Sequence, residues 1–344
     1  MRKGVQLLAM PMEKDRASPG GRHGLDMSCR DDGHKHANVT GGVQADEPAI
    51  SMSYSISDGY SQHLAVVLTS VLANNPGECF RFHILSSDLS TANREKLVKL
   101  EHVHSSCRIV FHQIDASLFE KLPVPPALEH VTREMYYRYL LPEVLEDENR
   151  TIYSDVDVLC VGKMRPLWEI DLEDNMIAAV PDDEAELKWR ELGQSAGAYF
   201  CSGLLVMDLA AMRAGGLTRR LFDVTEEFAT KLSWPDQDVI NIVFRDRILP
   251  LPSVWNCVSP YNPFRRDVRQ WHFQGFTQKP WCNIWRNMTW PAYLKYLLIS
   301  PYRANAMCFV WGHVKGFFYF RYTKKRVTRY ILCGIRVWKR KEDA

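Results

Sequence analysis

The alternation of two hydrophobic periods between Ile50 and Ile114 restricts the fold of this chain more than any other feature. Residues 50–56 alternate apolar and polar side chains, as a strand with one buried face does. The apolar residues that follow recur every three or four positions, which predicts a helix with one buried face. A second strand, a second helix and a third strand complete the pattern. This order predicts an α/β domain with a mainly parallel sheet and helices on its faces.

Similar patterns predict elements as far as Phe244. Asn74 to Gly77 ends the first helix, because Asn, Pro and Gly favour turns, and Ser90 can cap the second helix. We expect strands at 50–56, 80–85, 108–114, 151–161, 176–180 and 199–207, the fourth interrupted by two aspartates. We expect further helices at 133–141 and 236–244, and a loop at Pro123, Pro125 and Pro126.

The chain is expected to divide into a disordered leader (1–48), a folded domain (49–290) and a tail (291–344). The leader has no sustained apolar period. Its first apolar run is too short for a secretory signal and is followed at once by charged residues. The nine cysteines are scattered without a CxxC pair, which argues against a zinc ribbon and favours free thiols in a reducing cytosol.

The tail is basic and aromatic. It has 12 Lys and Arg against 2 Asp and Glu, whereas residues 1–290 have 31 basic and 39 acidic side chains. Pro301, Arg303, His313 and Lys315 interrupt every window of roughly 20 residues that might span a bilayer. We therefore expect a cytoplasmic protein that lies on the inner face of the plasma membrane and contacts its anionic surface. Alternatively, these aromatic residues complete the core while the cations lie in water.

The motif Ser154-Asp155-Val156-Asp157 lies within an apolar segment. Side chains two positions apart on a strand point the same way, so the two carboxylates repel each other unless a cation lies between them. Hard divalent cations take such oxygen ligands and bridge them to phosphates. The motif alone is a weak signal, because the aspartates can also cap a helix or lie in a polar turn.

Two later segments add candidate ligands. Asp236 and Gln237 follow Pro235, which is typical of a helix start. His272 and Gly275 precede Lys279 within eight residues. A lone histidine is more often structural, but this His, Gly and Lys might instead wrap a diphosphate beside a metal ion.

These segments together resemble glycosyltransferase family 8, the retaining enzymes that include bacterial lipopolysaccharide galactosyl- and glucosyltransferases. The resemblance runs from about Ile50 to Trp281. The residues that carry it are Ser57-Asp58-Gly59-Tyr60, Phe80 to Leu85, Tyr136-Tyr137-Arg138, Tyr153 to Leu159, Pro166-Leu167-Trp168, Tyr199-Phe200-Cys201-Ser202-Gly203, Asp236-Gln237-Asp238 and His272 to Trp281.

The resemblance implies a GT-A-like fold and a role for each matching position. Asp155, Asp157 and His272 would hold Mn²⁺ (or Mg²⁺), which binds the diphosphate of a UDP-sugar. Asp58 would contact the nucleoside, and Arg138 would lie near the uracil or the phosphates. Asp182, Asp236 and Gln237 would line the sugar pocket, while Gly275 and Lys279 would wrap the diphosphate. Without the resemblance, Arg138 would be read as a surface ion pair and Asp182 as a loop carboxylate.

The expected activity is the retaining transfer of glucose or galactose from UDP-glucose or UDP-galactose to a saccharide or lipid-linked saccharide. Cys201 stands where the family commonly has an asparagine that touches the donor sugar, which leaves the sugar open. The alternative is a non-catalytic membrane-associated binding protein. A phosphohydrolase would need ligands for a second metal, and no nucleic-acid-binding module accompanies the basic tail.

Overall fold

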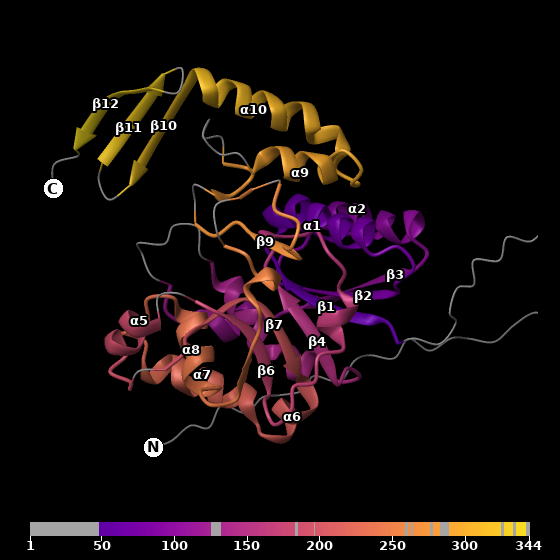
Figure 1. Ribbon diagram of the computed structural model, residues 1–344, viewed down its shortest axis with the longest axis vertical. Coiled ribbons are helices and arrows are strands. Elements are labelled where there is room, and N and C mark those ends of the chain that lie inside the picture. Colours follow the sequence, from indigo (N-terminus) through magenta and orange to yellow (C-terminus); the bar gives the residue numbers. More distant parts are fainter. Residues whose placement is uncertain are drawn as a thin grey trace, which may run out of the picture. The chain divides into compact units, whose positions relative to one another are not determined.

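A computed structural model describes residues 48–124, 132–182, 185–195, 197–258, 261–262, 264–275, 278–282, 289–324, 327–332 and 335–341 (Figure 1). Pro125, Pro126 and the expected leader up to residue 47 lie outside the described residues.

A seven-stranded sheet forms the centre of the domain, with the strand order β3-β2-β1-β4-β7-β6-β8. Parallel pairing joins β1 to β2, β2 to β3, β1 to β4 and β6 to β8, and only β7 runs against its neighbours in this sheet of described residues. The mainly parallel α/β sheet predicted from the sequence is confirmed. The strands are β1 (Ile50–Ser55), β2 (Phe80–Ser86), β3 (Cys107–Gln113), β4 (Arg150–Ser154), β6 (Ile177–Pro181), β7 (Phe200–Asp208) and β8 (Ile248–Pro250).

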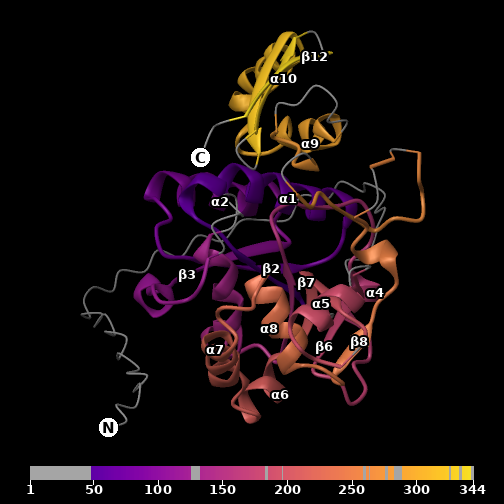
Figure 2. The ribbon, with the colours of Figure 1, turned by 90° about the vertical axis from the view of Figure 1, so that its left-hand side faces the viewer.

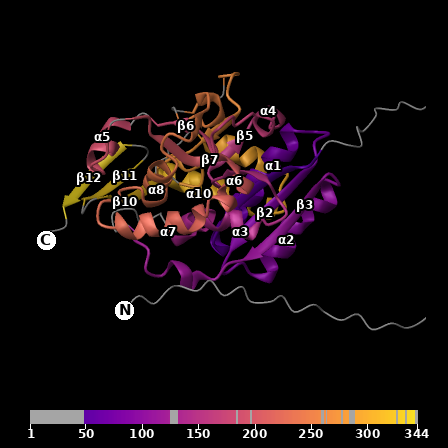
Figure 3. The same ribbon diagram turned by 90° about the horizontal axis from the view of Figure 1, so that it is seen from below.

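Alternating side chains of these strands enter two separate cores, one on each face of the sheet. In β7, for example, Leu204 and Val206 enter one core, and Leu205 and Met207 enter the other. Helices α1 (Ser61–Asn74) and α2 (Thr91–Val103) cover the first face. Helices α6 (Leu209–Ala214), α7 (Leu217–Glu227) and α8 (Pro235–Val243) cover the second face, as Figures 1 and 2 show from two directions and Figure 3 from below.

The helix caps follow the residue chemistry that the sequence predicted. Ser90 precedes α2 and its hydroxyl accepts a hydrogen bond from the Asn93 N–H, 3.4 Å away. Pro235 is the first residue of α8 rather than the residue before it, because proline lacks the N–H that this position leaves unused.

The strand expected at 151–161 is two strands in two sheets. β4 ends at Ser154, the chain turns through Asp155 to Asp157, and β5 (Val158–Cys160) pairs with β9 (Gln270–His272) in a small antiparallel ribbon. The Asp155 N–H donates to the Gly203 carbonyl at 2.9 Å, and the Val158 N–H donates back to the Asp155 carbonyl at 3.3 Å. This turn places both carboxylates at the sheet edge.

The helix expected at 133–141 is a 3₁₀ helix, Arg133–Leu140, followed by the short α3 (Leu141–Val144). Arg138 explains part of this difference, because its Nε donates to the Met135 carbonyl three residues earlier at 2.9 Å. The tighter helix buries Tyr136 to Leu140 continuously rather than on one stripe.

The described residues of the tail form helices α9 (Trp290–Leu297) and α10 (Ala306–Phe318) and an antiparallel sheet of β10 (Tyr319–Lys324), β11 (Val327–Leu332) and β12 (Ile335–Lys341). Tyr293, Tyr296 and Tyr302 are buried in the same core as α1 and α2. For these three aromatic residues the core interpretation is the correct one.

Within the described part of the chain, none of the helices is long and apolar enough to cross a membrane. The seven cysteines of that part are free thiols.

Substituting Leu297 should show whether α9 contributes to the main core. Leu297 is fully buried, whereas its neighbour Leu298 is 53% exposed. We expect Leu297→Ala to lower the free energy of unfolding by about 2–5 kcal/mol through the lost contacts and the cavity. Leu298→Ala should change it by less than about 0.5 kcal/mol. Urea unfolding of both variants measures this, and an equal effect of the two substitutions would contradict it.

Candidate active site

The candidate site lies at one edge of the central sheet. The parallel strands β1, β4 and β6 end there, at Ser55, Ser154 and Pro181. The antiparallel strand β7 begins there, so Cys201 and Gly203 lie beside the ends of its neighbours. Ligands of open α/β sheets bind outside the carboxyl ends of the strands, so this edge is the expected place for a site.

A cavity of about 430 Å³ opens at this edge. Its size is typical of small-molecule sites, which are about 300–1,000 Å³. The predicted site residues that line it are Arg138, Asp155, Asp157, Asp182, Asp236, Gln237, His272, Gly275 and Lys279. The sequence therefore named residues from five separate segments that the fold brings together.

Asp58 is the one predicted site residue that does not line this cavity. Its carboxylate accepts hydrogen bonds from the Ser90 N–H at 2.8 Å and from the Asn93 side chain at 2.9 Å, and these contacts lower its pKa. Asp58 thus holds the start of α2 against the loop after β1. Its neighbours Ser57 and Tyr60 line the cavity instead.

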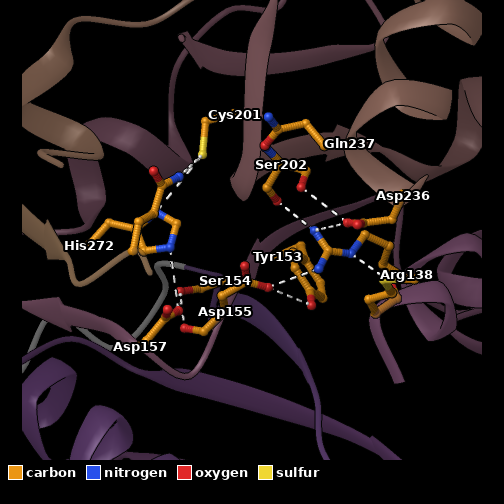
Figure 4. Close-up of polar contacts among 12 residues, drawn as sticks. Arg138, Tyr153, Ser154, Asp155, Asp157, Cys201, Ser202, Asp236, Gln237 and His272 are labelled. Atoms are coloured by element: carbon orange, nitrogen blue, oxygen red, sulfur yellow. Dashed lines mark hydrogen bonds and ion pairs between the residues drawn. The ribbon is translucent and has the colours of Figure 1, made fainter. Parts of the chain in front are cut away.

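Asp155, Asp157 and His272 meet at the floor of the cavity (Figure 4). One ligand atom from each lies within 4.8 Å of the others, and they are the single group with metal-ligand spacing among the described residues. Two carboxylates and an imidazole suit Mn²⁺ or a similar divalent cation. A second metal cluster, which a two-metal phosphohydrolase needs, is not found in the described part of the chain.

The Asp157 carboxylate of this cluster attracts positively charged groups. Asp157 is 7% exposed, and its carboxylate contacts His272 Nε2 at 3.4 Å and the Lys279 ammonium. Burial alone would raise the pKa of Asp157, but Lys279 and His272 outweigh it and hold the pKa well below its ordinary value. Burial would lower the pKa of His272, but the neighbouring Asp157 raises it to about 10. A divalent cation bound there would replace these positive charges at Asp157, and His272 would give up its proton so that the neutral imidazole could serve as a ligand.

Gly203 leaves the space that the cluster needs. A Cβ at this position would lie 2.3 Å from His272 Cε1 and 3.2 Å from Asp155 Oδ2. Every other amino acid would therefore displace the imidazole. This packing requirement is a second observation that the three residues form a built site.

Arg138 lies beside the metal cluster and is 3% exposed. Its guanidinium donates to the Ser202 carbonyl at 2.6 Å and to Asp155 Oδ1 at 2.9 Å, and it lies 3.3 Å from Asp236 Oδ2. The guanidinium also lies over the Tyr153 ring, with its Cζ atom 4.1 Å from the ring centroid. Arg138 is thus part of a buried ion-pair network, so the surface ion pair considered from the sequence is wrong.

The network sets the charges around Asp236. Burial raises the pKa of Asp236, and Arg138 partly offsets this effect. Burial would lower the pKa of Arg138, but Tyr153, Asp155 and Asp236 raise it further than burial lowers it. Arg138 therefore remains a cation that compensates two carboxylates.

Gln237 and Asp182 form the opposite wall. The Ser202 N–H donates to Gln237 Oε1 at 2.9 Å, and Gln237 Nε2 donates to Asp182 Oδ2 at 3.3 Å. Asn241, one turn later in α8, binds both the N–H and the carbonyl of Phe200, at 2.7 and 2.8 Å. These bonds fix the start of α8 against the first residues of β7.

The sequence did not single out some residues of this site. The Tyr153 hydroxyl donates to Asp155 Oδ1 at 3.0 Å, and Glu134 and Gln274 line the cavity. Tyr153 precedes the aspartate motif and Gln274 lies between His272 and Gly275, so both were inside segments already identified. Glu134 gave no signal, because the expected α-helix differs in phase from the observed 3₁₀ helix.

Known proteins are similar to most of this chain. The model of "Glycosyl transferase family 8" matches residues 51–284. A lipopolysaccharide 1,2-glucosyltransferase of Escherichia coli is 29% identical over 76% of this chain and 82% of its own length. A lipopolysaccharide 1,3-galactosyltransferase of Salmonella typhimurium is 24% identical over 69% of this chain and 74% of its own length. The crystal structure of the galactosyltransferase LgtC with donor and acceptor sugar analogs is similar to this chain with a TM-score of 0.63 and 25% identity, and the match covers 73% of this chain and 96% of that one.

Gly203→Ala should disrupt the metal cluster without unfolding the chain. The added methyl group would overlap His272 Cε1. We expect Mn²⁺ affinity, measured by calorimetry, to fall about ten- to hundredfold, as when a metal ligand loses its orientation. Gly59→Ala is the matched control, because no atom lies within 4 Å of the added group. Unchanged Mn²⁺ affinity in Gly203→Ala, with circular dichroism showing a folded protein, would contradict the expectation.

Proposed function

The chain belongs to glycosyltransferase family 8 and is a hexosyltransferase, and we propose that it transfers glucose or galactose from a UDP-sugar to a saccharide acceptor with retention of configuration. The observation that carries this proposal is the cluster of Asp155, Asp157 and His272 at the floor of the cavity. A metal ion at this place could stabilise the negative charge of a leaving diphosphate, whereas saccharide binding alone has no use for one. The cluster therefore favours catalysis over the non-catalytic alternative.

Asp155, Asp157 and His272 would hold Mn²⁺ (or Mg²⁺) in the working enzyme. Bound there, the ion would neutralise the diphosphate and act as a Lewis acid for its departure. Tyr153 and Arg138 hold the Asp155 carboxylate in place by hydrogen bonds. Such outer contacts fix the geometry of metal ligands.

Lys279 is the proposed second cation for the leaving group. Its ammonium contacts Asp157, so it already lies at the cluster. We expect it to exchange this carboxylate for a diphosphate oxygen when the donor binds. A positive charge placed where negative charge develops stabilises the transition state. The permissive backbone of Gly275, with φ of 71°, would let the same loop approach the diphosphate closely.

Gln237, Asp182 and Asp236 are proposed to surround the donor sugar. As the bond from the sugar C1 to the phosphate oxygen breaks, positive charge develops on the sugar ring. The oxygens of these side chains would stabilise that charge. An uncharged amide such as Gln237 is a poor nucleophile, so we favour attack by the acceptor hydroxyl from the leaving-group face. The hydroxyl oxygen then bonds to C1, and its proton passes to the departing phosphate oxygen.

The remaining assignments concern the nucleoside and the substrates. Arg138 is proposed to act near the uracil or phosphates through the carboxylates that it orients, and the nucleoside contact of Asp58 stays a prediction.

The similar proteins transfer glucose or galactose to lipopolysaccharide, which supports a hexose donor and a lipopolysaccharide or other cell-surface glycan as acceptor. Cys201 and Gln274 line the cavity together, with Gln274 Nε2 3.1 Å from Cys201 Sγ, and are the proposed determinants of the donor sugar.

We also propose that the enzyme lies on an anionic membrane surface, on the cytoplasmic side. Met307, Trp311, Val314 and Phe318 form one face of α10, which we call the α10 stripe, and are 79%, 58%, 39% and 56% exposed. Lys315 Nζ lies 5.4 Å from the Trp311 ring centroid. An exposed apolar stripe beside cations is typical of helices that lie in a membrane interface. The nine Lys and Arg residues after Tyr319 add the charge that attracts anionic lipids.

Asp157→Ala tests the catalytic proposal. We expect the wild type to release UDP from UDP-glucose or UDP-galactose only when Mn²⁺ is present, and the variant to lose at least about 100-fold in rate through the lost charge stabilisation. Asp223→Ala is the control, because this carboxylate is exposed on α7. If Asp157→Ala kept the wild-type rate, the proposed centre would be wrong. If no donor were turned over, calorimetry would show whether UDP binding requires Mn²⁺, and the absence of any binding would reject the proposal.

The same assay examines Gln237. Gln237→Ala should bind UDP and Mn²⁺ normally but lower kcat, because its amide is proposed to act on the sugar rather than on the nucleotide. Nearly full activity would remove the role assigned to Gln237.

Vesicle binding tests the membrane proposal separately. We expect Met307→Ser with Trp311→Ser to weaken binding to vesicles that contain phosphatidylserine by at least about 100-fold, since burying each of the two apolar side chains contributes about 1.5–3 kcal/mol. Phe264→Ser is the control, because Phe264 is 83% exposed outside α10. Equal binding of the double variant and the wild type would show that the α10 stripe does not contact lipid.

A further inference from the structure

A second cavity, of about 290 Å³, lies between the β5–β9 ribbon and α9. Trp271 of β9 and Lys295 and Tyr296 of α9 all line this cavity; Figure 1 shows both elements. The residues that line the second cavity are Asn74, Val161, Tyr261, Arg265, Arg266, Val268, Trp271, Lys295 and Tyr296. None of them lines the cavity that contains the metal cluster. Trp271 and His272 are neighbours on β9, and successive side chains of a strand point to opposite faces. The second cavity is therefore a separate site, behind the metal cluster.

The lining is cationic and contains no carboxylate. Arg265, Arg266 and Lys295 contribute three positive charges. Arg265 is held by Asp267 through two hydrogen bonds of 2.8 and 2.9 Å, so one of the three charges is compensated. For Arg266 and Lys295, no ion pair with any described residue is present. Two cations without a carboxylate partner at one cavity favour an anionic ligand.

One neutral group adds a directed donor. The Tyr296 hydroxyl oxygen accepts hydrogen bonds from Asn74 Nδ2 at 2.8 Å and from Lys295 Nζ at 3.4 Å. An amide nitrogen and an ammonium can only donate, so the Tyr296 hydroxyl proton is left to donate elsewhere. Tyr296 itself is 3% exposed, so this donor is fixed by its packing.

Aromatic rings form the apolar part of the cavity. Trp271 is 3% exposed, and the Tyr261 ring meets it edge-on with centroids 5.1 Å apart. Aromatic walls with a few placed polar groups are typical of small-molecule sites. At about 290 Å³ the cavity is at the small end of such sites, so it suits a ligand of about one sugar unit with its charged group.

We infer that this second cavity binds a phosphate-bearing saccharide, with the phosphate at Arg266 and Lys295 and the sugar against Trp271 and Tyr261. Arginine and lysine bind phosphate by charge-assisted hydrogen bonds, and the Tyr296 hydroxyl supplies a further donor. The inference does not depend on the donor or the reaction, because the two cavities share no residue.

Calorimetry with glucose 6-phosphate, inorganic phosphate and glucose tests this inference on the full chain, in EDTA and without UDP. Arg266→Gln with Lys295→Gln should weaken glucose 6-phosphate binding by at least about tenfold, because two charge-assisted contacts are lost. Arg219→Gln with Arg220→Gln removes the same charge from exposed positions of α7 and should leave binding unchanged. Lys279→Gln should also leave it unchanged, because Lys279 belongs to the other cavity.

Three results would overturn the inference: no binding of either phosphate compound, equal binding of glucose and glucose 6-phosphate, or equal losses in the two double variants. Vesicles that contain phosphatidic acid distinguish the source of the phosphate. Binding to them that the Arg266 and Lys295 substitutions abolish, without binding of the soluble sugar phosphate, would replace the saccharide with a lipid headgroup. Binding of the soluble compound alone supports the saccharide.

Discussion

The buried guanidinium of Arg138 holds the charged part of this molecule together. It joins Asp155 at the end of β4, Asp236 at the start of α8 and the Ser202 carbonyl in β7. Removing one partner from a buried ion pair leaves an uncompensated charge, which destabilises a protein by about 3–5 kcal/mol. The two carboxylates can therefore lie around a cavity only because this cation is there. The end of β4, the first residues of β7 and the start of α8 thus share this one group.

The carboxylates of the site fall into two groups, which have different positively charged partners. Asp155 and Asp236 share Arg138, whereas Asp157 is compensated by Lys279 and His272. The first pair is tied to a group that cannot move without disturbing the core. The second is tied to Lys279, at the end of a loop, and to an imidazole. The two groups of carboxylates are thus compensated from different segments of the chain.

The sequence predicted the mainly parallel sheet and its helices because hydrophobic period depends on local burial, and this burial is regular from Ile50 to Gln113. Nine of the residues that the resemblance suggested line one cavity, because a resemblance contains long-range contacts that a hydrophobic period does not. The prediction from sequence erred where tertiary contacts override local preference. The 151–161 segment is split between two sheets, because Val158 to Cys160 pair with the distant strand β9. The sequence left two interpretations of the tail open for a similar reason, since an aromatic side chain has the same sequence pattern in a core as at a surface.

The distance along the chain between the metal ligands has a consequence for how the protein is made. Asp157 meets Lys279 across 122 residues, and His272 pairs through β9 with a strand that is completed more than a hundred residues earlier. Contacts of such separation form late, after the loop-closure cost of the intervening chain has been met. At a synthesis rate of about 5–20 residues per second, several seconds pass between the synthesis of Asp157 and that of Lys279. A nascent chain can therefore have a nearly complete sheet and still lack the cation site, and occupancy of that site marks the end of folding rather than its start.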